Sequence, residues 1–286
     1  MVQLISADQY GVIGDPISHS QSPSIHKLFA QQLGHSIDYK AYHVSENQLE
    51  SFIYEFRKKG GRGLNITLPH KTTALKYVDI INPRAKEADA INTLIIDEEK
   101  IIGDNTDGIG LINDLEINFN QSLKNKRILI LGAGGATLGI LSPLLKREPK
   151  NILVANRTAS KAKIVTSKFK SNFSLDACGI NELDPEQIFD IIINATSIGI
   201  TKQSINFPSF VITENTVCYD LSYSYEPTLF MRWSIENKAK LAIQGWGMLI
   251  EQAAASYCLW RDKKPNTSSI LKQLNINASS QVLRRL

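Results

Sequence analysis

A glycine-rich loop between an apolar strand and an apolar helix is the feature that most constrains how this chain can fold. Residues 127–131 predict a buried strand, Gly132-Ala133-Gly134-Gly135-Ala136 a loop, and residues 137–146 a helix that Pro143 should kink. In a parallel sheet this order forms a dinucleotide-binding unit, because the glycines let the backbone approach a pyrophosphate that the helix amides bind. The third glycine position is Thr137, so the fingerprint is incomplete.

Short apolar strands alternate with helices along the rest of the chain. Strands joined through helices run parallel with right-handed crossovers, so this alternation predicts an α/β protein. The expected fold is an N-terminal three-layer α/β substrate domain with a mostly parallel sheet, followed by a Rossmann-like dinucleotide-binding domain. Strands are expected over 10–14, 39–44, 63–68, 94–96, 100–102, 127–131, 151–155, 190–194, 217–221 and 241–243, and helices over 23–33, 47–59, 72–78, 83–90, 108–118, 137–146, 160–169 and 248–260.

The strand that follows the glycine loop ends in cations. An NAD-specific fold usually places Asp or Glu about 20 residues after the loop, to accept from the ribose 2′-hydroxyl. Here residues 151–155 lead into Asn156-Arg157-Thr158, and Lys161 lies one helical turn later. Cations at a helix N-terminus oppose its dipole, but they match a 2′-phosphate through charge-assisted hydrogen bonds. The chain is therefore predicted to use NADP.

A second strand of the same sheet ends in Asn194-Ala195-Thr196-Ser197. Parallel strands end at one edge of a sheet, so the hydroxyls of Thr196 and Ser197 would border the nicotinamide half of a bound dinucleotide. Ordinary turn chemistry explains the same residues equally well.

A lysine just beyond a strand end is the candidate for chemistry in the N-terminal half. Residues 63–68 predict a strand with Asn65 and Thr67 on one face, and the strand ends at Pro69. Lys71 follows at the edge where open α/β sheets bind ligands. A second polar turn, over 103–108, contributes Asp107. An isolated lysine here would be a surface residue at the start of a helix. Together with Asn65, Thr67 and Asp107, however, Lys71 predicts a ligand site.

Composition excludes several classes of function. The 32 basic and 28 acidic residues leave a net charge of +4, spread along the chain, which predicts no nucleic-acid and no membrane surface. Cys178, Cys218 and Cys258 have no metal-ligand spacing, so we expect no metal site and three buried thiols in a reducing compartment. The N-terminus lacks a signal-peptide pattern, which predicts a cytoplasmic protein.

The length of 286 residues suits two domains. The predicted division assigns residues 1–107, together with C-terminal helices over about 247–286, to a substrate-binding catalytic domain. Residues 108–246 are assigned to an NADP-binding domain. The tail over 268–274 is expected to pack on the first domain.

Eight segments together resemble the shikimate dehydrogenase family, in its order and over nearly the whole chain. One of them is Asn65-Ile66-Thr67-Leu68-Pro69-His70-Lys71, and the eight cover residues 14–23, 65–71, 90–93, 103–108, 132–136, 156–158, 194–197 and 247–252. The resemblance implies NADP-dependent interconversion of shikimate and 3-dehydroshikimate, a step of chorismate and aromatic amino-acid biosynthesis.

The resemblance also implies roles for individual residues. Lys71 and Asp107 would form the catalytic pair, and Ser18 and Ser20 would hold the substrate carboxylate. Ring hydroxyls and the edge of the substrate would be contacted by Asn65, Thr67, Asn92, Gln252 and Tyr223. The implied cofactor contacts are Gly132, Ala133, Gly134, Gly135, Ala136, Asn156, Arg157, Thr158, Lys161, Thr196, Ser197, Leu221 and Gly245. The sequence departs from the family pattern at Leu221, where methionine is frequent, and at Gln244, where an acid is common.

Some alternatives stay open at the level of sequence. Lys71 either transfers the proton or only positions the alcohol, because desolvation favours a neutral lysine whereas a neighbouring carboxylate favours the ammonium. One of Ser18 and Ser20 could instead cap the helix that follows. A quinate/shikimate dehydrogenase of broader specificity and a non-catalytic metabolite-binding module are the rival functions. A small-molecule substrate and a homodimer are the expected partners.

Overall fold

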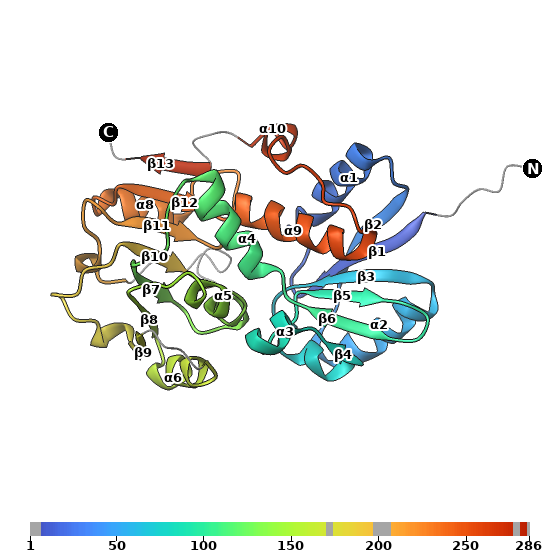
Figure 1. Ribbon diagram of the computed structural model, residues 1–286, viewed down its shortest axis with the longest axis horizontal. Coiled ribbons are helices and arrows are strands. Elements are labelled where there is room, and N and C mark those ends of the chain that lie inside the picture. The colour runs from blue at the N-terminus through green and yellow to red at the C-terminus, as the bar shows by residue number, and fades with distance from the viewer. Residues whose placement is uncertain (1–6, 170–173, 197–206, 277–280, 285–286) are drawn as a thin grey trace, which may run out of the picture. The chain divides into compact units, whose positions relative to one another are not determined.

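The computed structural model describes residues 7–169, 174–196, 207–276 and 281–284 (Figure 1). The chain divides into two compact units, one made of Met1–Gly110 and Leu249–Ile270 and the other of Leu111–Met248 and Leu271–Leu286. The predicted α/β class with two mostly parallel sheets is confirmed.

The first unit contains a six-stranded sheet in the order β2-β1-β3-β5-β6-β4. The β1–β2, β1–β3 and β4–β6 pairs are parallel, whereas β5 is antiparallel to both β3 and β6, as expected for a hairpin. Its elements are β1 (Asp8–Gly14), α1 (Ser22–Leu33), β2 (Ile37–His43), η1 (Glu46–Gln48), α2 (Leu49–Lys58), β3 (Gly61–Ile66), η2 (Thr73–Tyr77), β4 (Ile80–Ile81), α3 (Pro83–Ala88), β5 (Thr93–Ile96) and β6 (Ile101–Asp104).

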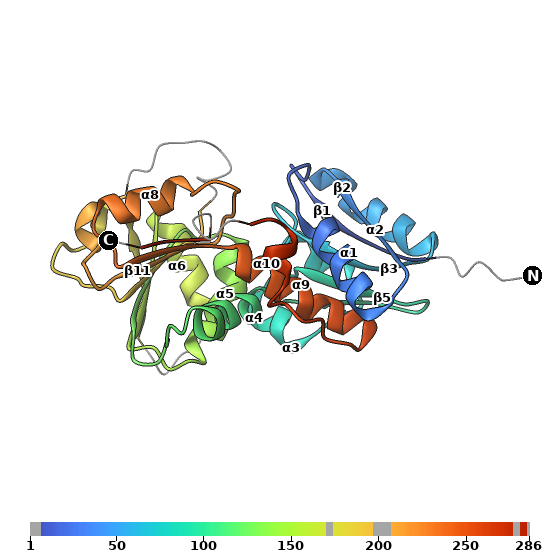
Figure 2. The ribbon, with the colours of Figure 1, turned by 90° about the horizontal axis from the view of Figure 1, so that it is seen from above.

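Successive residues of β1 serve opposite faces of this sheet, as the two-residue period of a strand requires. Ile13 packs in a cluster with Ile53 of α2, on one face. Val12 packs with Tyr39 on the other face, where Trp260 of α9 (Trp246–Arg261) closes the cluster. Helices α2 and α9 therefore cover opposite faces and complete the three layers (Figure 2).

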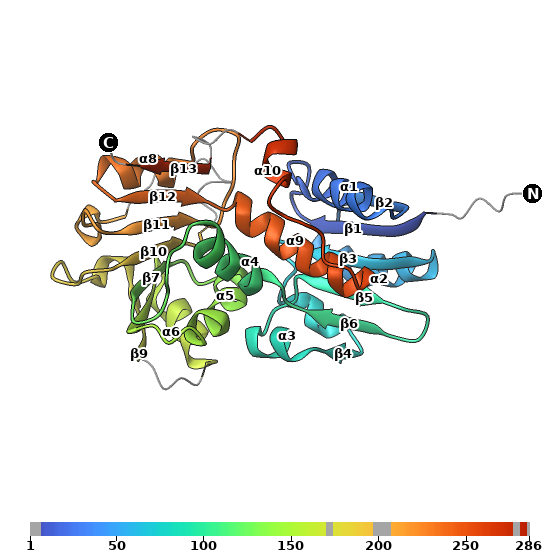
Figure 3. The ribbon, with the colours of Figure 1, turned by 45° about the horizontal axis from the view of Figure 1, so that its top comes forward.

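The second unit contains a seven-stranded sheet in the order β13-β12-β11-β10-β7-β8-β9 (Figure 3). All its pairs are parallel except β12–β13, and its core includes Leu129, Ile192 and Phe230. Its elements are α4 (Asp107–Asn113, which enters from the first unit), η3 (Asp114–Asn118), β7 (Arg127–Leu131), α5 (Gly135–Leu145), β8 (Asn151–Asn156), α6 (Ala159–Ser167), β9 (Ser174–Gly179), η4 (Ile180–Glu182), β10 (Ile191–Asn194), η5 (Ser209–Val211), β11 (Val217–Asp220), α8 (Leu229–Glu236), β12 (Leu241–Gln244), α10 (Ile270–Gln273) and β13 (Val282–Arg284).

Several predicted elements differ from the structure. The segment after Lys71 is the 3₁₀-helix η2 and not an α-helix, and the helix expected over 108–118 changes to a π-helix at Asp114. Strands β4, β9 and β13 and helix α8 were not predicted. All three strands lie at sheet edges, and they are short or polar, so they lack the apolar run that marks a buried strand.

The C-terminal residues also differ from the predicted division of the chain. Residues up to 286 were assigned to the first domain, but β13 pairs with β12 in the sheet of the second unit, which begins again at Leu271. Antiparallel pairing with β13 satisfies backbone hydrogen-bonding groups of β12. This pairing joins two segments distant in the chain, so the local sequence pattern does not indicate it. The thiols differ as well, because Cys218 is buried whereas Cys178 and Cys258 are half-buried.

None of the helices in the described part of the chain has the length and apolarity needed to cross a membrane. Over the same residues, no group of three or more His, Cys, Asp or Glu side chains is arranged to hold a metal ion.

A buried histidine lies in the aromatic layer between α1 and the sheet. The ring of His26 stacks on Tyr39 with centroids 4.2 Å apart and planes 7° from parallel, and Trp260 lies 5.3 Å away. Burial lowers the pKa of His26 from 6.5 to about 3, outweighing a contact with Asn65. The native fold therefore holds this imidazole neutral.

His26→Phe should remove part of the acid sensitivity of the fold. Below pH 6.5 the unfolded chain takes up a proton at His26 that the native state refuses until about pH 3, so wild-type stability falls by about 1.4 kcal/mol per pH unit through this group. The free energy of unfolding, measured with urea at pH 7 and pH 5, should fall by roughly 2 kcal/mol less in the variant. Equal losses in the two proteins would contradict the prediction.

Candidate functional site

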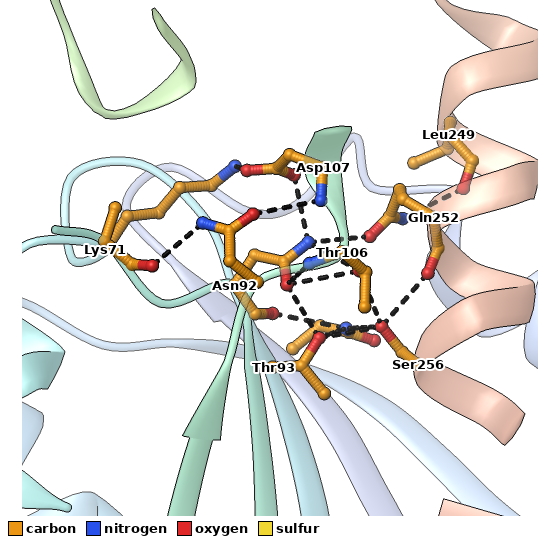
Figure 4. Close-up of polar contacts among 11 residues, drawn as sticks. Lys71, Asn92, Thr93, Thr106, Asp107, Leu249, Gln252 and Ser256 are labelled. Carbon is orange, nitrogen blue, oxygen red and sulfur yellow. Dashed lines mark hydrogen bonds and ion pairs between the residues drawn. The ribbon is translucent and has the colours of Figure 1, made fainter. Parts of the chain in front are cut away.

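An ion pair between Lys71 and Asp107 lies at the end of strand β3 in the first unit. The Lys71 Nζ is 2.6 Å from the Asp107 Oδ2, and the two side chains are 17% and 6% exposed (Figure 4). The Lys71 carbonyl accepts from the Ile91 N–H at 2.7 Å, and the Asp107 N–H donates to the Asn105 Oδ1 at 3.0 Å. A backbone group of each residue thus holds its loop in place. The two side chains meet as the sequence predicts, and their catalytic role stays a prediction.

His70 anchors the lysine loop, a role that the sequence prediction missed. Its ring is buried, and the Nε2 donates to the Val44 carbonyl at 2.6 Å. A carbonyl can only accept, so the proton is on Nε2. The residue before Lys71 is therefore tied to the end of β2 and leaves the lysine aimed at Asp107.

Asn92 joins the pair from the loop before β5. Its Nδ2 donates to the Asp107 Oδ1 at 2.9 Å and lies 3.2 Å from the Gln252 Oε1 of α9. Each Asp107 oxygen thus accepts one hydrogen bond, from Lys71 and from Asn92 respectively. Four of the residues predicted to touch the substrate, Lys71, Asn92, Asp107 and Gln252, lie in one hydrogen-bonded group (Figure 4).

Asn65 is more deeply embedded than its predicted role suggests. It is 5% exposed, its Oδ1 accepts from the Tyr39 hydroxyl at 2.7 Å, and its Nδ2 donates to the Ser256 Oγ at 3.1 Å. Thr67 is half-buried, and a Cβ at Gly14 would lie 2.5 Å from its Cγ2, so that glycine makes room for it. The Asn65 amide is engaged inside the protein, whereas Thr67 is accessible.

Ser18 and Ser20 lie in the loop that follows β1. The Ser20 Oγ accepts from the Ser22 N–H at 3.3 Å, at the start of α1, whereas Ser18 is exposed. The expectation that one serine has a local role at this helix therefore fits Ser20. This loop is held beside the lysine loop, because the Asp15 N–H donates to the Leu68 carbonyl at 3.0 Å.

The glycine loop of the second unit has the geometry that its sequence predicts. Gly132 has a φ of 110°, and a Cβ there would lie 2.9 Å from the Ala195 backbone. The third glycine of the fingerprint is replaced by a buried threonine, whose Oγ1 donates to the Gly132 carbonyl at 2.9 Å and holds the loop. Gly134 is the N-cap of α5 and provides no capping side chain, so the amides of Gly135 and Ala136 at the helix start suit an anion.

The predicted cations lie at the start of α6. Arg157 and Lys161 are exposed, and neither forms an ion pair with any residue that the structure describes. The Asn156 Nδ2 donates to the Thr158 carbonyl at 3.0 Å, which holds the turn before the helix. Strand β8 is parallel to β7, so this turn and the glycine loop leave the sheet at the same edge.

A chain of hydrogen-bonded polar side chains lies at the same edge of the sheet, where β10 and β11 end. Thr196 donates from its Oγ1 to the Asn194 Oδ1 at 2.7 Å, and the Asn194 Nδ2 donates to the Asp220 Oδ1 at 3.0 Å. Burial raises the pKa of Asp220 to about 6 and outweighs the hydrogen bonds that it accepts. The predicted contact Ser197 lies outside the described residues. Asp220 was missed, because one acid ending an apolar strand gives no distinct signal.

Two predicted cofactor contacts, Leu221 and Gly245, lie against each other. A Cβ at Gly245 would lie 2.5 Å from the Leu221 carbonyl oxygen, so the glycine permits a close backbone approach. The Gln244 Oε1 accepts from the Ser224 N–H at 2.7 Å, and its Nε2 donates to the Ser224 carbonyl at 3.0 Å. A carboxylate could make the first bond but not the second, which explains an amide at this position. The Tyr223 ring packs on Trp246, with centroids 4.7 Å apart.

Comparison with known proteins identifies the family. Three family models match: the shikimate dehydrogenase substrate binding domain over residues 12–94, shikimate / quinate 5-dehydrogenase over 115–206, and the shikimate 5′-dehydrogenase C-terminal domain over 245–274. The "Shikimate dehydrogenase (NADP(+))" of Methylococcus capsulatus is 44% identical over 93% of this chain and 96% of its own. The protein of the same name from Alkalilimnicola ehrlichii is 40% identical over 93% and 98%.

Solved structures agree with the relatives. A crystal structure of shikimate dehydrogenase in complex with NADP+ superposes with a TM-score of 0.83 at 33% identity, covering 95% of this chain and 96% of its own. The resemblance inferred from the eight segments is confirmed, and the chain belongs to the shikimate dehydrogenase family.

Proposed function

We propose that this protein is an NADP-dependent oxidoreductase that reversibly reduces 3-dehydroshikimate to shikimate, a step of chorismate and aromatic amino-acid biosynthesis. The observation that carries the proposal is the Lys71–Asp107 pair, 2.6 Å apart, with Asn92 and Gln252 bonded around it. In a chain of this family, such a group suits proton transfer to an oxygen of a polyhydroxylated ring.

The roles of the two units follow from their contents. The first unit would bind the substrate, because it contains the Lys71 group and the Ser18–Ser20 loop beside it. The second unit would bind NADP, because it contains the Gly132 loop and the Arg157 turn. The predicted boundary between residues 107 and 108 stays a prediction, as do a homodimer and a cytoplasmic location.

NADP, when bound, supplies hydride exchange at the reacting carbon. The protein supplies the proton. Both Asp107 oxygens accept hydrogen bonds from protein donors, so Asp107 acts as an acceptor that aims Lys71. A lysine ammonium has three donors, and two remain for the substrate oxygen. In the direction of reduction, Lys71 gives a proton to that oxygen; in the direction of oxidation, it takes the hydroxyl proton back.

Positioning of the substrate is proposed for the remaining residues of the first unit. Ser18 and Ser20 would donate to the ring carboxylate, and Thr67, Asn92 and Gln252 would bond ring hydroxyls. Asn65 stays in this set as a prediction, and a hydroxyl there would share an amide already bonded to Tyr39 and Ser256. The contact of Tyr223 with the substrate stays a prediction.

The cofactor contacts are proposed on the edge of the second sheet. The amides after Gly134 would bind the pyrophosphate, and Arg157 with Lys161 would bind the 2′-phosphate, with Thr158 between them. The proposed contacts at the glycine loop and toward the nicotinamide are Gly132, Ala133, Gly134, Gly135, Ala136, Asn156, Thr196, Ser197, Leu221 and Gly245.

Oxidation of shikimate and of quinate, each with NADP+ and with NAD+, tests the function directly. We expect reduction of NADP+ with shikimate to be the fastest of the four reactions. Lys71→Ala is the control for contaminating host enzyme and should abolish the activity. Equal rates with shikimate and quinate would favour a quinate/shikimate dehydrogenase. If neither substrate were oxidised with either cofactor, a non-catalytic binding module would be favoured.

Lys71→Arg separates proton transfer from simple positioning. An arginine keeps the positive charge and can still pair with Asp107, but it does not give up a proton. If Lys71 transfers the proton, kcat should fall about 10²- to 10⁴-fold while the KM for shikimate changes little. Near-normal turnover by the arginine variant would show that the lysine only positions the alcohol.

Arg157→Ala tests the choice of cofactor. Loss of a charge-assisted hydrogen bond to the 2′-phosphate should raise the KM for NADP+ roughly 10- to 100-fold and leave that for NAD+ unchanged. Lys163→Ala is the matched control, since it removes one exposed positive charge from α6, the helix that begins two residues after Arg157. An equal effect of the two substitutions would mean that only the general positive charge of the helix matters.

A further inference from the structure

Ser256 is a buried hydroxyl at the back of the Lys71–Asp107 site. It lies on α9, one helical turn after Gln252, and is 0% exposed. Its Oγ lies 2.7 Å from the Thr93 Oγ1, 3.1 Å from the Thr106 Oγ1 and 3.1 Å from the Asn65 Nδ2 (Figure 4). It therefore joins a helix to three separate strand ends of the first unit.

The orientation of the Asn92 amide fixes which of these groups donates. The backbone N–H of Thr106 lies 2.8 Å from Asn92 and can only donate, so the atom that it meets must be the amide oxygen. The Thr93 hydroxyl donates to the same oxygen at 2.8 Å. These two bonds use both lone pairs of that oxygen, and the Nδ2 is left facing Asp107.

The remaining protons then follow. Since the Asn92 oxygen is filled, the Thr106 hydroxyl, 3.2 Å from it, gives its proton to Ser256 instead. The Ser256 proton has two acceptors within reach, the Thr93 Oγ1 at 2.7 Å and the Gln252 carbonyl at 3.1 Å. Since the Thr93 proton is used on Asn92, the shorter of these contacts needs Ser256 as its donor. The Asn92 Nδ2 donates to the Thr106 Oγ1 at 2.9 Å. The result is a closed ring in which Ser256, Thr93, Asn92 and Thr106 each donate to the next.

The ring bears directly on the ion pair. A reversed Asn92 amide would bring its oxygen against the Asp107 Oδ1, now 2.9 Å from the Nδ2, and two acceptors repel. Hydrogen bonds that run in one direction around a ring polarise and strengthen one another. The ring therefore disfavours the reversed amide and keeps the second Asp107 oxygen for Lys71.

We propose that Ser256 is a positioning residue for the reaction, which acts through the ring of Thr93, Asn92 and Thr106 to hold the Asn92 amide as the donor to Asp107. This inference rests on the proposed function for its kinetic consequence. The ring itself does not depend on that function.

Ser256→Ala tests the positioning role in the full-length protein. The value of one net hydrogen bond corresponds to a roughly three- to tenfold fall in kcat for shikimate oxidation, with the KM for NADP+ unchanged. Ser234→Ala is the matched control, since Ser234 is another fully buried helical serine whose Oγ donates one turn back, to the Phe230 carbonyl, and it belongs to the second unit. An unchanged kcat, or the same fall in both variants, would overturn the positioning role.

A double-mutant cycle on stability tests the ring without reference to activity. Thr106→Val keeps the shape of the side chain and removes its hydroxyl, whereas Thr106→Ser keeps the hydroxyl. Thr106→Val already breaks the ring, so adding Ser256→Ala to it should cause little further loss of stability. In the Thr106→Ser background the ring is intact, so Ser256→Ala should cause its full loss of stability there. Additive losses with valine would overturn the ring. If the wild-type protein failed to oxidise shikimate, the proposed function would fall and this cycle would still decide on the ring.

Discussion

The carboxylate of Asp107 is the interaction on which the rest of the candidate site depends. It accepts from Lys71 on one oxygen and from Asn92 on the other, so one anion fixes the loops after β3, before β5 and after β6. Without it, the half-buried Lys71 ammonium would have no opposite charge in this group, and the Asn92 amide would lose its strongest acceptor. The chemistry and the local fold therefore depend on the same carboxylate.

The sequence predicts the sheets better than their edges. Apolar runs such as those of β7 and β10 are buried on both faces, which is why composition alone marks them as central strands. Strand β9 is half-exposed and polar, β4 has two residues, and β13 exists because β12 offers it backbone partners. Pairing between distant segments is a property of the folded chain, so local patterns cannot reveal it.

The site divides in the same way. Residues that would touch a ligand, such as Lys71 and Arg157, follow strand ends, and topology converts that position into a prediction. Residues that support them carry no such mark. Ser256 and Thr93 are 163 positions apart in the chain and meet across a buried hydroxyl contact. In the sequence, Ser256 is one small residue in an alanine-rich helix, and nothing local distinguishes it from a packing residue.

Two departures from expected sequence patterns, one from the dinucleotide fingerprint and one from the family pattern, are explained by the hydrogen bonds that the substituted residues make. Thr137 replaces a glycine, and its hydroxyl donates to the Gly132 carbonyl and holds the loop that the glycine pattern serves. Gln244 replaces an acid and makes paired bonds with the Ser224 backbone that an acid could only half supply. Different residues can therefore meet the same geometric requirement as the residue of a motif. In this chain Thr137 and Gln244 meet it, because their hydrogen bonds hold the loop backbone rigidly where strands of the second sheet end.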